Sequence, residues 1–154
     1  MISWTSGIGI CLLTFIGMEG LSWSIHKFLF HGPLWFIHKT HHNHKAHTNG
    51  FWEANDVFSL GFALTSMILI IIGVADLTWH FWTGLGITLY GLVYFLVHDV
   101  LAHRRLKWWR SSKNSYLNAV VRAHKMHHKH LQKEDGEAFG LLWVRKQYFT
   151  NRKK

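Results

Sequence analysis

The chain has 154 residues, of which 49% are hydrophobic and 16% aromatic, and its formal net charge is +9. Its length predicts one domain over residues 1–154. So many apolar residues argue against an ordinary soluble protein. The Lys and Arg residues flank apolar segments instead of lining an aromatic-rich groove, which argues against nucleic acid as a partner.

Three apolar stretches are long enough to cross a membrane. Residues 57–75 and 77–97 carry no charged side chain, and residues 2–25 carry one, Glu19. About 20 apolar residues in a helix cross the ~30 Å hydrocarbon layer of a bilayer. The sequence therefore predicts an all-α integral membrane helical bundle with three spanning helices, and a fourth span is left open.

The basic residues indicate how these helices are oriented. All 17 Lys and Arg residues lie within residues 27–45 and 104–154. With three crossings and a tight turn at Asp76, both stretches share one face of the membrane. By the positive-inside rule this face is the cytoplasmic side of the cytoplasmic membrane, where anionic lipid headgroups are the expected partner.

Ten histidines show one spacing twice. In each half, a pair five positions apart precedes a His-x2-His-His group, where x is any residue. They are His26, His31, His38, His41, His42, His98, His103, His124, His127 and His128. A repeated spacing is not expected by chance, so the ten are predicted to form one metal site at the cytoplasmic ends of the helices. Imidazole ligands suit iron, copper or zinc, and their number favours two ions.

The His-x2-His-His groups are predicted to lie on amphipathic cytoplasmic helices, because residues at i, i+3 and i+4 share one helical face. Residues 34–42 are expected to form the first such helix at the interface. Ser115 is expected to cap the second, whose apolar face continues into its histidines.

The pairs five positions apart are harder to place, because five residues along a regular α-helix rotate by about 140°. Gly32 and Pro33 follow His31 directly. The first helix is therefore expected to unwind there and to aim His31 differently from His26. The alternative is that each pair straddles two metal ions.

Two carboxylates are candidates for orienting ligand histidines. Glu19 lies two helical turns before His26, and Asp99 lies one turn before His103. A carboxylate that accepts from a ligand imidazole fixes its tautomer. Four further histidines match neither spacing and are predicted to lie outside the site: His44, His47, His80 and His130.

Three smaller expectations concern the loops and the C-terminus. Asn55 or Asp56 is predicted to cap the second spanning helix. Glu53, nearby, has no evident structural role. The segment from Arg145 onward is short and basic and is expected to fray.

Several short segments of the sequence resemble those of a known protein family. They are Gly17-Met18-Glu19, His26-Lys27-Phe28, His38-Lys39-Thr40-His41-His42, Phe51-Trp52-Glu53-Ala54-Asn55-Asp56, Leu89-Tyr90-Gly91-Leu92-Val93-Tyr94-Phe95, His98-Asp99, His103, Ala123-His124-Lys125-Met126-His127-His128 and Phe139-Gly140-Leu141-Leu142. Together they resemble the bacterial beta-carotene hydroxylases of the fatty acid hydroxylase superfamily, over about residues 10–143.

The resemblance implies that residues 1–154 form a single membrane hydroxylase domain with two non-haem iron ions. Such a monooxygenase uses O2 and two electrons from a ferredoxin-type donor. It hydroxylates the beta-ionone rings of beta-carotene at C3, which gives cryptoxanthin and then zeaxanthin. The carotenoid would arrive through the bilayer, and Arg104, Arg105 and Lys107 would suit docking of an acidic donor. No particular residue is predicted to bind the substrate.

Two kinds of alternative remain. One is a fatty acyl or sterol hydroxylase or desaturase of the same superfamily, which the histidine spacing alone does not exclude. The other is a membrane haem protein or a metal transporter. Haem needs only two or four histidines within spanning segments, and a transporter needs polar residues in the membrane interior, where only Glu19 qualifies.

Overall fold

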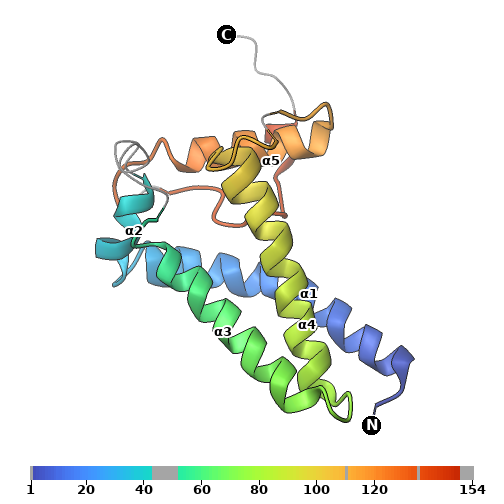
Figure 1. Ribbon diagram of the computed structural model, residues 1–154. Helices are drawn as coiled ribbons and strands as arrows, with labels where there is room; N and C mark the ends of the chain where they lie inside the picture. Colours follow the sequence, from blue (N-terminus) through green and yellow to red (C-terminus); the bar gives the residue numbers. More distant parts are fainter. Residues whose placement is uncertain (1, 43–51, 110, 135, 150–154) are drawn as a thin grey trace. The chain divides into compact units, whose positions relative to one another are not determined.

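The computed structural model describes residues 2–42, 52–109, 111–134 and 136–149, and this part of the chain is helical, without strands. The elements in order (Figure 1) are α1 (Trp4–Ile25), η1 (His26–Phe30), α2 (Trp35–His42), α3 (Asp56–Gly73), α4 (Trp79–Tyr94), η3 (Phe95–Ala102), α5 (Ser115–His127) and η4 (Lys146–Tyr148). The predicted all-α class is confirmed. His44 and His47 lie outside the described residues.

Three helical segments are long and apolar enough to cross a membrane. They cover Trp4–Phe30, Asp56–Gly73 and Trp79–Ala102. These segments match the three predicted spans, and the described residues contain no fourth. The predicted class of membrane helical bundle is therefore confirmed.

The chain divides into two compact units. Met1–Leu21 and Asp56–Val93 form the first, and Ser22–Asn55 and Tyr94–Lys154 form the second. The first unit holds most of the membrane helices, and the second holds all ten histidines of the repeated spacing. A single domain over the whole chain stays a prediction.

Within the first unit, α4 packs against both α1 and α3 through glycines. A Cβ on Gly84 would lie 2.8 Å from the Ser66 carbonyl oxygen of α3, and one on Gly86 would lie 2.6 Å from the Cys11 carbonyl oxygen of α1. The Ser66 hydroxyl also donates to the Gly84 carbonyl at 2.8 Å. Small residues and interhelical hydrogen bonds are the usual means of helix association in lipid, where the hydrophobic effect does not drive it.

Glu19 of α1 lies in this first unit. Its carboxylate accepts a hydrogen bond from the Tyr90 hydroxyl of α4 at 2.8 Å. An acid inside a membrane helix is costly without a partner, so this bond gives Glu19 a structural role. Its predicted role beside a ligand histidine stays a prediction.

The two histidine pairs five positions apart lie on π-helical turns, which the sequence reasoning missed. The His31 backbone N–H donates to the His26 carbonyl at 3.0 Å, and His103 donates to His98 in the same way at 2.9 Å. A π-turn closes hydrogen bonds from i to i+5, so residues five apart come to lie one above the other. The helix ends at His31 as expected, but what changes the direction of His31 is a π-turn and not the predicted unwinding of the last turn.

The predicted cap of the helix that begins at Ser115 was also wrong. The cap of α5 is Asn114 and not Ser115: the Asn114 side chain accepts from the backbone N–H groups of Tyr116 and Leu117. Asn114 has extended backbone angles, as an N-cap requires, whereas Ser115 is already helical.

The predicted fraying from Arg145 onward is wrong for residues 145–149, which are packed; residues 150–154 lie outside the described residues. Tyr148 of η4 is buried against Ala119 and Ala123 of α5. The Arg122 side chain donates to the Tyr148 carbonyl at 2.6 Å, and the Tyr148 hydroxyl donates to Glu137 at 2.6 Å. A buried aromatic ring and these hydrogen bonds hold residues 145–149 on α5.

Candidate metal centre

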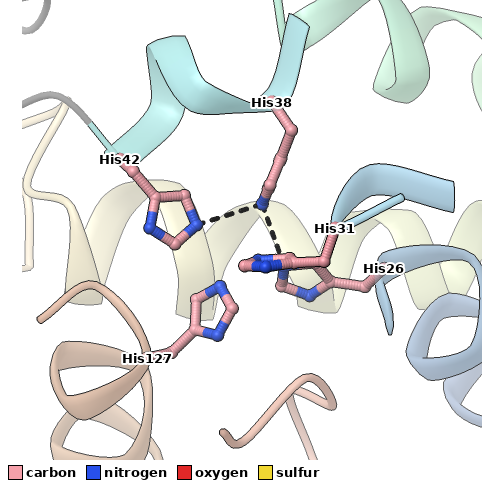
Figure 2. A group of neighbouring side chains, drawn as sticks. All are labelled: His26, His31, His38, His42 and His127. Carbon is pink, nitrogen blue, oxygen red and sulfur yellow. Dashed lines mark hydrogen bonds between the residues drawn. The ribbon is translucent and has the colours of Figure 1, made fainter. Parts of the chain in front are cut away.

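Five histidines of the second unit form the first of two groups in the described chain whose ring nitrogens could hold a metal ion. We call it cluster A: His26, His31, His38, His42 and His127. One nitrogen from each lies within 4.8 Å of the corresponding nitrogen of every other member. Figure 2 shows the five rings pointing toward one another from η1 and the residue that follows it, from α2 and from α5.

The second group, cluster B, has four members: His41, His98, His103 and His124. The His41 and His98 rings are stacked with centroids 4.9 Å apart, and His124 lies 4.5 Å from His98. The tenth histidine, His128, stands beside both clusters, with its ring 4.4 Å from His124 and 4.6 Å from His42.

The two halves of the repeated spacing exchange one histidine each. His41 of α2 joins the histidines of the second half in cluster B, and His127 of α5 joins those of the first half in cluster A. Each π-turn pair stays within one cluster, so the alternative in which a pair straddles two ions does not describe this geometry. Two separate groups agree with the prediction of two ions.

In cluster A every ring presents its Nδ1 atom to an oxygen acceptor. His26 and His127 donate to the backbone carbonyls of Phe139 and Glu137, each at 2.8 Å. The remaining acceptors are the Lys133 carbonyl for His31, the Asn55 side chain for His38 and the His130 carbonyl for His42. Most of these acceptors belong to the segment after α5, which sequence reasoning left without a role.

Ala138 helps this segment present its carbonyls. It lies between Glu137 and Phe139 and has a φ of 55°. A non-glycine residue with positive φ is uncommon, and such backbone geometry often occurs at functional sites. Here it lies between the two residues whose carbonyls accept from His127 and His26.

Two histidines of cluster B lie beside carboxylates, whereas the cluster A rings donate to neutral oxygens. His41 donates from Nδ1 to Glu53 at 3.0 Å. The Nδ1 atom of His98 lies 3.5 Å from the Asp99 carboxylate. Glu53 thereby gains the role that the sequence did not explain, while the predicted bond from His103 to Asp99 stays a prediction.

The positions and lone pairs of the Nε2 atoms show whether the cluster A residues fit a metal ion. Because the Nδ1 protons of His26 and His38 are donated to oxygens, their Nε2 atoms, 3.0 Å apart, carry only lone pairs. Two lone pairs this close repel unless a cation lies between them. Metal–nitrogen bonds of about 2.0–2.1 Å separate neighbouring ligand atoms by about 2.9–3.4 Å. The Nε2 atoms of His31 and His127 are also buried without a hydrogen bond, so cluster A fits a metal ion.

Burial keeps these imidazoles neutral. It lowers the pKa of His38 to about 3 and that of His127 to about 2, with neighbouring histidines adding to the shift. Burial likewise moves the pKa values of His41 and His124 well below the ordinary value. Metal binding requires the neutral form, so the site is ready for a cation at neutral pH.

Two histidines that the prediction excluded are found outside both clusters. The His80 ring stacks on Trp79, with centroids 3.7 Å apart, in the first unit. The His130 side chain lies 3.8 Å from Glu137, and only its backbone carbonyl meets a cluster histidine.

The helices and the clusters define a membrane protein with a histidine-rich, metal-binding centre. The sequence model of the fatty acid hydroxylase family matches residues 11–145, and the chain belongs to that family. The matched range includes all ten histidines of the repeated spacing.

Individual relatives extend this finding. The beta-carotene hydroxylase of Pseudescherichia vulneris is 37% identical over 89% of this chain and 76% of its own length. That of Pantoea ananas is 37% identical over 92% of this chain and 79% of its own length. A chloroplastic beta-carotene 3-hydroxylase of an Oncidium hybrid is 36% identical over 86% of this chain and 43% of its own length. No solved structure matches significantly.

Proposed function

We propose that this chain hydroxylates the beta-ionone rings of beta-carotene at C3, giving cryptoxanthin and then zeaxanthin. The observation that carries the proposal is the 37% identity, over 89–92% of the chain, to proteins named beta-carotene hydroxylase. The paired histidine clusters support it, because hydroxylation of an unactivated ring carbon needs a metal that can activate O2.

We assign one iron ion to cluster A and one to cluster B. Imidazole ligands also suit copper and zinc, but zinc has no redox chemistry. When bound, iron supplies the activation of O2. The balanced reaction takes a C–H bond, O2, two electrons and two protons to an alcohol and water. The histidines hold the ions, and an oxygen at Nδ1 keeps the cluster A imidazoles and His41 in the tautomer that binds.

We propose that a ferredoxin-type protein supplies the two electrons. Arg104 and Lys107 are exposed and suit docking of an acidic donor. Arg105, predicted from sequence to join them, does not: its side chain is only 11% exposed and pairs with Glu53 and Asp99.

We further propose that the protein lies in the cytoplasmic membrane with its metal centre on the cytoplasmic side. The support is the confinement of all 17 Lys and Arg residues to two stretches on one predicted face. Reporter fusions after residue 76 and at the C-terminus test it, and the two should report opposite sides.

Pigment analysis in cells that make beta-carotene tests the activity. The chain should convert beta-carotene to zeaxanthin, and the purified protein should contain two irons and lack a Soret band. His41→Ala and His127→Ala should form no zeaxanthin, because each removes a ligand from one cluster. His80→Ala, outside both clusters, is the control and should retain activity. Unchanged beta-carotene with the folded, iron-loaded chain and a supplied donor would refute the proposal.

The family's name favours one further candidate, a hydroxylase of fatty acyl chains. Lipid analysis of the same cells separates the two. New hydroxylated or desaturated acyl chains, with beta-carotene unchanged, would support that activity.

A further inference from the structure

Arg105 joins two carboxylates that lie next to cluster B. One guanidinium nitrogen lies 3.0 Å from Glu53, and another lies 3.2 Å from Asp99. The other oxygen of Glu53 accepts from His41, and Asp99 lies beside His98. A single side chain thus connects the groups that border two of the four cluster B histidines.

These groups are withdrawn from solvent. The Glu53 side chain is 2% exposed, and those of Arg105 and Asp99 are 11% and 12% exposed. Two buried carboxylates side by side would repel each other strongly without a cation between them. The guanidinium places its donors in a fixed plane and can meet both carboxylates at once, which a lysine ammonium cannot do equally well.

The backbone is shaped to bring Arg105 to this position. Arg104 has a φ of 59°, and the Arg105 backbone N–H donates to the Asp99 carbonyl at 2.9 Å. A positive φ followed by a backbone hydrogen bond that reaches back into the helix resembles the Schellman motif, which ends a helix. Positive φ at a non-glycine residue costs about 1–3 kcal/mol, so it persists only where the surrounding contacts hold it.

We propose that Arg105 is a positioning residue for cluster B alone: it fixes Glu53 and Asp99 beside His41 and His98 and thereby strengthens metal binding there. This inference rests on the proposed metal centre. Cluster A, whose rings donate to the Asn55 amide and to backbone carbonyls, does not depend on Arg105.

Cobalt(II) binding tests the role of Arg105 without measuring enzyme activity. The full chain in detergent is stripped of metal and titrated with cobalt(II), followed by visible absorption. The wild type should bind two ions. His127→Ala should leave the cluster B ion, and His124→Ala should leave the cluster A ion. Adding Arg105→Gln should weaken binding about 10–100-fold in the His127→Ala background and leave it unchanged in the His124→Ala background.

Two further variants sharpen the result. Arg145→Gln removes an exposed arginine from the same unit and should change neither ion. Arg105→Lys keeps the charge and should restore part of the cluster B affinity; it also replaces Arg105→Gln in the comparison if that chain does not fold.

The possible outcomes separate this inference from the proposed function. Equal weakening of both ions, or no weakening of either, would overturn the role of Arg105, as would a wild type that binds no cobalt. A wild type that binds two ions in this pattern, yet leaves beta-carotene unchanged when loaded with iron, would refute only the function.

Discussion

At the scale of single residues, the oxygen at each Nδ1 atom decides what a histidine can do. An imidazole that donates from Nδ1 keeps a lone pair on Nε2, where a metal can bind. Asn55 is the one side-chain amide among these oxygens in cluster A and lies 2.8 Å from His38 Nδ1. It can therefore be changed without altering the backbone.

We predict that Asn55→Ala weakens the cluster A ion about 10–100-fold, because His38 loses the acceptor that fixes its tautomer. Cobalt(II) titration in the His124→Ala background measures this. Asn55→Asp keeps an oxygen in place and should bind more tightly than Asn55→Ala. Equal affinities for the two variants would show that the acceptor does not matter.

At the scale of elements, the π-turns align the histidine pairs. In η1 the wider turn brings the His26 and His31 rings to a centroid separation of 5.3 Å. Gly32 comes two residues after η1, and a Cβ added to it would clash with the Phe28 carbonyl oxygen. Because that oxygen belongs to the backbone, the turn itself would have to shift.

We predict that Gly32→Ala destabilises the protein by about 1–3 kcal/mol and weakens the cluster A ion, since it displaces the turn that carries His31. The melting temperature in detergent and cobalt(II) affinity measure the two effects. The control is Gly17→Ala in α1, where an added Cβ meets nothing within 4 Å. It should be neutral or stabilise the helix by up to about 1 kcal/mol. A Gly32→Ala protein that melts and binds cobalt like the control would contradict the prediction.

At the scale of the whole molecule, the buried histidines make stability depend on pH. The pKa values of His38 and His127, about 3 and about 2 in the folded chain, lie below the ordinary histidine value of about 6.5. Below that value the unfolded chain therefore binds more protons than the folded chain, and stability is lost as the pH falls. Each such histidine contributes about 1.4 kcal/mol per pH unit in this window.

We predict that the metal-free protein melts at the same temperature at pH 7.5 and pH 8.5 but at a steeply lower temperature below about pH 6. Bound metal should delay the loss, because the ion binds the neutral imidazoles and protons compete with it. Thermal unfolding with and without metal across this range measures both effects. A melting temperature that stays constant down to pH 5 would contradict the burial of neutral histidines.

The sequence by itself determined the features that follow from composition and spacing. Apolar length predicted the three spans, since crossing a bilayer needs a minimum number of apolar residues whatever their packing. The repeated spacing predicted which histidines gather, because α-helical periodicity places positions 38, 41 and 42, and likewise 124, 127 and 128, on one face. The short segments that resemble the beta-carotene hydroxylases predicted the fatty acid hydroxylase family.

Only the tertiary structure decided how those histidines are shared and held. His41 and His127 exchange halves because α2 and α5 supply histidines to both clusters. The π-turns widen helices that local periodicity describes as ordinary. Backbone carbonyls such as that of Phe139 have no sequence signature, since every residue carries one. In the sequence Arg105 is one of several basic residues that follow a membrane helix. Its contact with Glu53 could not be predicted, because the packing of distant segments, and not the spacing along the chain, decides which of them meet.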